Sequence, residues 1–192
     1  FITLWKDPLG QVSLAVTTLF WGAGATLRLV VLAWAAVALK FNIKESTQLV
    51  ATVAIGIAVG SIIASKYIKL EESTKVLPAG ILMGFMVMLM AFLSDWQHAA
   101  ILLFLIGALS GFFVVPLNAL LQHRGHHLIG AGHSIAVQNF NEHIGILFML
   151  GLYLLMVKAE IAITSIVIAF GFFIILSMSI INKVYRGKTA SH

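Results

Sequence analysis

Six long, predominantly apolar runs constrain this chain more than any other feature of its sequence. They cover residues 12–39, 47–65, 76–93, 99–121, 132–157 and 161–181. A helix needs about 20 apolar residues to cross the roughly 30 Å hydrocarbon layer of a membrane, and each run is close to that length or longer. A transmembrane β-barrel would instead show segments of about 10 residues with alternating polarity. The sequence therefore predicts an all-α membrane protein with six transmembrane helices.

The composition excludes several soluble classes of protein. Hydrophobic residues make up 60% of the chain and charged residues 10%, whereas soluble domains carry about 25% charged residues. This excludes a soluble enzyme, a disordered chain and a secreted disulfide scaffold. Without cysteine there is no disulfide, thiolate metal site or thiol nucleophile. The net charge of +5 is explained by basic residues that flank the membrane, so we expect no nucleic-acid partner.

Short connectors join the six runs and leave no room for a soluble domain. We expect a lead-in over residues 1–11, one transmembrane bundle over residues 12–181 and a tail over residues 182–192. Most Lys and Arg residues outside the runs lie in the lead-in, the tail and the second and fourth connectors. Basic residues favour the cytoplasmic side, so both termini are predicted to be cytoplasmic. The chain starts at Phe1 rather than methionine, which indicates a fragment of a longer protein or a processed chain.

Arg28 is the strongest single indication of function. It lies about 24 Å from the start of its run and about 16 Å from the end, at 1.5 Å per helical residue. An arginine at that depth costs at least about 2.5 kcal/mol, so it should face a cavity or an acidic partner. It is either half of a fixed ion pair or a cation that binds an anion or takes part in gating. Trp21, two turns earlier on the same face, is a packing aromatic or a second lining residue.

The fifth run carries a polar stripe. Within an arc of roughly 100° lie Ser134, Gln138, Asn141, Glu142 and Gly145, and the stripe extends to Asn139 and His143. These side chains either form hydrogen bonds between helices or line a wet substrate path. In the second case Glu142 would pair with Arg28, accept a proton or contact a cationic head group. The third and sixth runs are poor in such groups, so we expect them to face lipid.

Further candidates lie in and after the fourth run. Asn118 follows Pro116, which predicts a kink with local hydrogen bonds or a polar wall. The following connector, 122–131, contains Arg124 and three histidines. It is interpreted as a cytoplasmic cap on anionic lipid, with a metal site as the alternative that we do not expect. Paired glycines one turn apart in the second, third and fourth runs predict close helix packing, or a hinge. No spacing fits a hydrolase site or a phosphate loop, so we expect neither enzyme activity nor a cofactor.

Six spans with a polar set on the first, fourth and fifth resemble half of a major facilitator superfamily transporter. That fold has two six-helix halves, each made of two inverted three-helix units. The resemblance implies that the first and fourth spans line a central cavity and that the partner is the other half. Gly60, Lys66 and Lys69 loosely match the superfamily's cytoplasmic loop motif, with Ala64 and Ser65 at its acidic position. The candidate gating residues are Gly60, Lys66, Lys69 and Arg124.

Two stretches, residues 111–122 (GFFVVPLNALLQ) and 130–142 (GAGHSIAVQNFNE), resemble the bacterial lysophospholipid transporters of the inner membrane. The resemblance implies the C-terminal half of such a transporter. It would move lysophosphatidylethanolamine and lysophosphatidylglycerol from the outer to the inner leaflet by alternating access, for re-acylation by a cytoplasmic acyltransferase. The implied substrate-binding residues are Arg28 for the phosphate, Gln138, Asn141 and Glu142 for the head group, Trp21 and Asn118 beside them, and Phe112 and Phe113 along the tail.

Two other functions remain open at this stage. One is a major facilitator carrier of a small solute or drug, with proton coupling through Glu142. The other is a membrane interaction module without a transport path, in which Arg28 and the polar stripe would be sealed.

Overall fold

The computed structural model describes residues 2–189, and these residues contain helices and no strand. The elements are α1 (Ile2–Lys6), α2 (Pro8–Ala38), α3 (Ile43–Tyr67), the 3-10 helix η1 (Leu70–Val76), α4 (Leu77–Met90), α5 (Trp96–Ile129), α6 (Ala131–Lys158) and α7 (Ile163–Thr189). Within the described part, six of the helical segments are long and apolar enough to cross a membrane. The predicted all-α architecture with six candidate spans is confirmed.

Short polar side chains fix where several helices begin. The Asp7 carboxylate accepts a hydrogen bond from the Gly10 amide, and Pro8 occupies the first turn of α2. Asn42 and Glu45 form a reciprocal capping box at the start of α3. Such caps satisfy amides that have no partner inside the helix. Helix α2 therefore begins four residues before the apolar run at residue 12, because the cap and not the hydropathy determines its start.

The expected connector over residues 122–131 is almost entirely helical. Helix α5 continues to Ile129 and α6 begins at Ala131, so Gly130 alone separates them. Gly130 has a φ of 83°, a conformation that side-chain-bearing residues rarely adopt. The histidine-rich tract is thus the last turns of α5 and not a loop. The apolar run ends near residue 121 because polar residues follow it, but a helix can continue beyond the membrane surface without a break. The change in polarity therefore did not mark the end of α5.

Three pairs of helices form the closest contacts: α3 with α5, α2 with α6, and α4 with α7. Glycine lies at each of these contacts. A Cβ on Gly22 would lie 2.7 Å from the Gly145 carbonyl oxygen, and one on Gly171 would lie 2.7 Å from the Gly84 carbonyl oxygen. A Cβ on Gly107 would collide with the Val53 carbonyl oxygen. Close backbone contacts of this kind hold helices together in a membrane through van der Waals packing. The hydrophobic effect does not do so there, because the lipid tails are as apolar as the helix surfaces.

The packing is consistent with two related three-helix units. When α2, α3 and α4 are exchanged with α5, α6 and α7, the α3–α5 contact becomes the α6–α2 contact and the α4–α7 contact is unchanged. The contact between α2 and α7 likewise becomes the one between α5 and α4. This pattern is consistent with the six-helix half of a major facilitator transporter.

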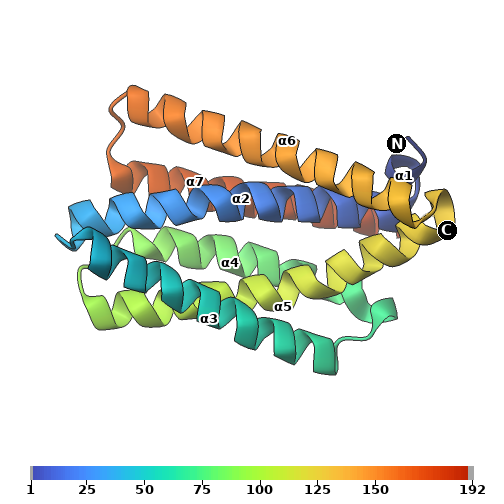
Figure 1. Ribbon diagram of the computed structural model, residues 1–192, viewed down its shortest axis with the longest axis horizontal. Helices are drawn as coiled ribbons and strands as arrows, with labels where there is room; N and C mark the ends of the chain where they lie inside the picture. Colours follow the sequence, from blue (N-terminus) through green and yellow to red (C-terminus); the bar gives the residue numbers. More distant parts are fainter. Residues whose placement is uncertain (1, 190–192) are drawn as a thin grey trace.

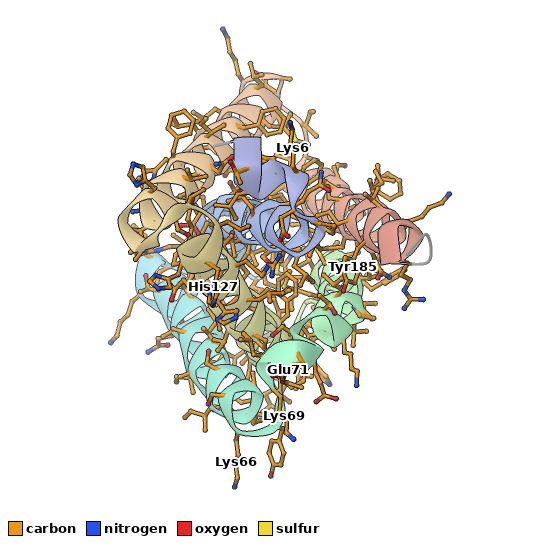
Figure 2. All side chains as sticks on the ribbon, turned by 90° about the vertical axis from the view of Figure 1, so that its right-hand side faces the viewer. Lys6, Lys66, Lys69, Glu71, His127 and Tyr185 are labelled. Atoms are coloured by element: carbon orange, nitrogen blue, oxygen red, sulfur yellow. The ribbon has the colours of Figure 1, made fainter. Side chains whose placement is uncertain are left out.

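Both ends of the chain lie at the same end of the bundle, at the right of Figure 1. In the same view α6 and α3 lie along opposite edges, with α2 between them. Figure 2 looks onto the end that carries the termini, where Lys6, Lys66, Lys69 and His127 lie. Three of the basic residues outside the expected spans therefore lie together at this end.

Candidate functional site

Arg28 lies on the wall of a cleft between α2 and α3. The cleft has a volume of about 450 Å³, and Ser110 of α5 contributes to its lining. The Arg28 side chain is exposed, as a residue of a cavity should be. The structure therefore places Arg28 at a cavity. A cavity is one of the two environments expected for an arginine at this depth in the membrane, and an acidic partner is the other.

The described residues provide no acidic partner for Arg28. Among residues 2–189 no hydrogen bond or ion pair involves the Arg28 guanidinium. Glu142, the acidic residue suggested for it, lies on another side of α2. The close contact between Gly22 and Gly145 sets the relative height of α2 and α6. At 1.5 Å per residue, Arg28 and Glu142 are offset by roughly 13 Å along these helices.

Apart from Arg28, the cleft is nearly apolar. Its lining residues are Phe20, Gly24, Leu27, Arg28, Val31, Thr47, Val50, Ala51, Val53, Ala54, Ile57 and Ser110. The two hydroxyl groups already have acceptors, since Ser110 donates to the Ile106 carbonyl at 2.7 Å and Thr47 to the Ile43 carbonyl at 2.7 Å. Among the lining residues, the guanidinium therefore remains as the free polar group.

The polar stripe of α6 is buried between helices instead of lining this cleft. Gln138 donates hydrogen bonds to Asn118 Oδ1 at 2.8 Å and to Glu142 Oε1 at 2.7 Å. Asn141 donates to the Val137 carbonyl at 2.8 Å within its own helix. Gln138 is 7% exposed and Glu142 8%. In this conformation the stripe joins α6 to α5 by hydrogen bonds, which is the first of the two interpretations given above.

None of the predicted aromatic residues, Trp21, Phe112 and Phe113, lines the cleft. Trp21 is 45% exposed and meets Phe20 edge-on at 5.7 Å between ring centroids. Phe20 lines the cleft and also contacts Phe113, which is buried in the core. Phe112 packs against the same core and does not line the cleft. Phe20, which the sequence reasoning did not select, is therefore the aromatic at the cleft.

At the end of the bundle that carries the termini, Arg124 is held by an ion pair. Its guanidinium donates two hydrogen bonds to the Asp7 carboxylate, one of them from Nε to Oδ2 at 3.1 Å. Burial by itself raises the pKa of Asp7, but the Arg124 hydrogen bond, the Gly10 amide and the Arg124 charge outweigh it, so the pKa lies below its usual value. The pair fastens the start of α2 to the last turns of α5. The Asp-Pro sequence at residues 7 and 8 is a helix-start signal that could have revealed Asp7.

The other loop candidates lie apart from Arg28. Gly60 packs so closely on α5 that a Cβ would collide with the Ala108 carbonyl. Lys66 and Lys69 are exposed near the end of α3. The rings of His123 and His127 lie 4.7 Å apart between centroids. In the described part of the chain, no group of three or more His, Asp or Glu side chains could hold a metal ion.

Comparison with known proteins identifies related lysophospholipid transporters. The chain is 51% identical over 156 residues to the lysophospholipid transporter LplT of Yersinia pestis (strain Pestoides F). The match to LplT of Yersinia pseudotuberculosis serotype O:3 (strain YPIII) has the same identity and extent. This chain is homologous to a segment of the bacterial lysophospholipid transporters. The resemblance drawn from residues 111–122 and 130–142 is thereby confirmed.

The matched residues make up 81% of this chain and 38% of the length of either relative. The chain thus spans well under half of the curated transporters that it matches. No family profile and no solved structure matches it. Together with the six candidate spans, the relatives support a multi-pass membrane protein.

Proposed function

We propose that this chain works together with a second, N-terminal six-helix half as a lysophospholipid transporter. The complete protein carries lysophosphatidylethanolamine and lysophosphatidylglycerol from the outer to the inner leaflet of the bacterial inner membrane by alternating access. A cytoplasmic acyltransferase then restores the second acyl chain. The relatives named as lysophospholipid transporters support this proposal.

One observation carries the proposal within this chain: an unpaired guanidinium on the wall of an apolar cleft. A lysophospholipid joins one anionic phosphate to one apolar tail. Arg28 offers the phosphate a planar, permanently charged donor of hydrogen bonds, and the cleft around it is lined by aliphatic side chains and Phe20. A carrier of a small polar solute would need more polar lining. A pure interaction module would need Arg28 to be sealed.

The test compares Arg28→Ala and Arg28→Lys with the unmodified full-length protein. Lysophospholipid uptake into cells that lack the native transporter should fall to background for Arg28→Ala, with only partial loss for Arg28→Lys, which keeps the charge. Lys158→Ala, at the end of α6 and exposed, is the matched loss of a cation away from the cleft. All variants should insert at equal levels. Undiminished uptake by Arg28→Ala would remove this residue from the mechanism.

The proposed orientation puts both termini in the cytoplasm. The end that carries the termini also carries Lys6, Lys66 and Lys69 (Figure 2), and positive residues favour the cytoplasmic side. This chain has no cysteine, so a thiol introduced into it reports on sidedness once any cysteines of the other half have been replaced by serine. Ser65→Cys should react with a membrane-impermeant maleimide only after the cells are opened, whereas Lys158→Cys should react in intact cells. The reverse pattern would contradict the orientation.

A further inference from the structure

The wall of the α2–α3 cleft is lined by small residues where larger ones would fit. Gly24 faces open space, since a Cβ placed on it would meet no atom within 4 Å. Across the cleft, α3 presents Ala51 and Ala54, and both are exposed. The other glycines of the helix interfaces differ, because a Cβ on Gly22 or Gly107 would meet a neighbouring backbone. Gly24 is therefore small without a packing reason.

The cleft is long. Its lining runs from Phe20 to Val31 on α2 and from Thr47 to Ile57 on α3. Eleven helical steps of 1.5 Å correspond to roughly 16 Å. One extended acyl chain matches this length and this apolar lining.

We propose that this cleft is the slot for the single acyl chain of the substrate, and that Gly24, Ala51 and Ala54 set the longest chain it accepts. The proposal rests on the function proposed above and names the part of the lipid that this surface recognises. Arg28 on the same wall keeps the phosphate beside the tail. A lipid with two acyl chains would leave one of them outside the slot.

The slot continues into a second hollow at the end away from the termini. Thr47 lines both, and the second hollow is also lined by Asn42, Lys44 and Ser46. The Ser46 hydroxyl is buried without a hydrogen-bond partner among the described residues. The ammonium of Lys44 offers a phosphate its first contact there. An acyl chain can therefore slide in lengthwise while its head group passes from Lys44 to Arg28.

The decisive experiment uses the full-length protein in proteoliposomes with short-chain and long-chain lysophosphatidylethanolamine. Gly24→Leu should lower long-chain transport by about tenfold or more, because the new side chain displaces several methylene groups from the slot. Short-chain transport should fall much less, so the measured quantity is the ratio of long-chain to short-chain transport. The matched control is Gly151→Leu on α6, where a Cβ would also meet nothing within 4 Å. That variant should keep the full chain-length profile.

A second measurement needs no variant and so does not depend on the folding of Gly24→Leu. A lysophospholipid with a photoreactive group on its acyl chain should label residues 47–57 of the unmodified protein, and a diacyl lipid with the same group should not. Equal labelling by both lipids would mean ordinary bilayer contact and would overturn the slot. Absence of label there would mean that the other half of the protein covers the cleft, with the same consequence.

The two proposals fail in different ways. If the unmodified protein moves no lysophospholipid, the proposed function is wrong. If it does, and Gly24→Leu and Ala54→Leu both keep its chain-length profile, the transport stands and the slot is refuted.

Discussion

The ion pair between Asp7 and Arg124 allows a quantitative test of how the start of α2 is fastened to the end of α5. The Asp7 carboxylate has two tasks: it caps α2 through the Gly10 amide at 2.7 Å and it receives two hydrogen bonds from Arg124. Asp7→Asn keeps a good capping side chain but removes the charge. Asp7→Ala removes both. The two variants therefore separate the ion pair from the cap.

The burial of the pair sets the expected magnitude. The Asp7 side chain is 13% exposed and that of Arg124 is 33% exposed. Exposed ion pairs contribute about 0.2–1 kcal/mol, and hydrogen bonds to charged groups about 1.5–3 kcal/mol. A partly buried pair with two hydrogen bonds lies between these limits, so we expect a coupling free energy of about 1–2 kcal/mol. Asp7→Ala should cost about 1 kcal/mol more than Asp7→Asn, through the lost cap.

The sign of the pH dependence follows from the lowered pKa of Asp7. A carboxyl group whose pKa is lower in the folded state stabilises that state fully above its unfolded pKa, about 3.9. The contribution is lost as the pH falls through the folded pKa. The coupling free energy should therefore be constant from pH 8 to pH 5 and decline only below about pH 4.

The assay is a double-mutant cycle on unfolding of the full-length protein in detergent micelles, with Asp7→Asn, Arg124→Gln and the double variant. A coupling free energy near zero at pH 7 would show that the pair contributes nothing to stability. A coupling that disappears already near pH 6 would refute the argument from Asp7.

Two further predictions concern helix packing. Gly107→Leu should lower the thermal unfolding temperature strongly, since overpacking costs about 1–3 kcal/mol or more and the α3 backbone lies against this position; an unchanged temperature would contradict the close α3–α5 contact. Gln138→Leu should cost about 0.6–1.7 kcal/mol, the range of hydrogen bonds between membrane helices, because Asn118 and Glu142 lose their donor. Asn139→Leu, on the exposed side of the same helix, should change the stability little. Equal losses of stability in the two variants would argue against the hydrogen bond between Gln138 of α6 and Asn118 of α5.

Sequence reasoning is most informative where a single side chain carries a large energy. Arg28 could be selected because a charge in mid-membrane must have an opening or a counter-charge. The glycine pairs predicted close helix contacts because small residues are what such contacts need. Gly60, for example, packs directly on the Ala108 backbone. These inferences use one residue and its depth, and both can be read from the chain.

The same reasoning was weaker where two elements had to be combined. Gln138, Asn141 and Glu142 were known to share one helix face, but whether that face met water or α5 depended on the rotation of α6. Ala51, Ala54 and Gly24 gave no indication in the sequence, because small apolar residues are ordinary in any span. Asp7 and Arg124 are far apart in the chain, and their pairing depends on how α1 and α2 cross the end of α5.

By itself, the sequence determined the class of this protein, its six spans and the depth of Arg28 along its span, since the cost of polar groups in lipid depends on position along a helix. The tertiary structure alone decided which helix faces meet. It buried the α6 stripe against α5 and left Arg28 open beside α3, because close glycine contacts fix the rotation and height of each helix against its neighbour.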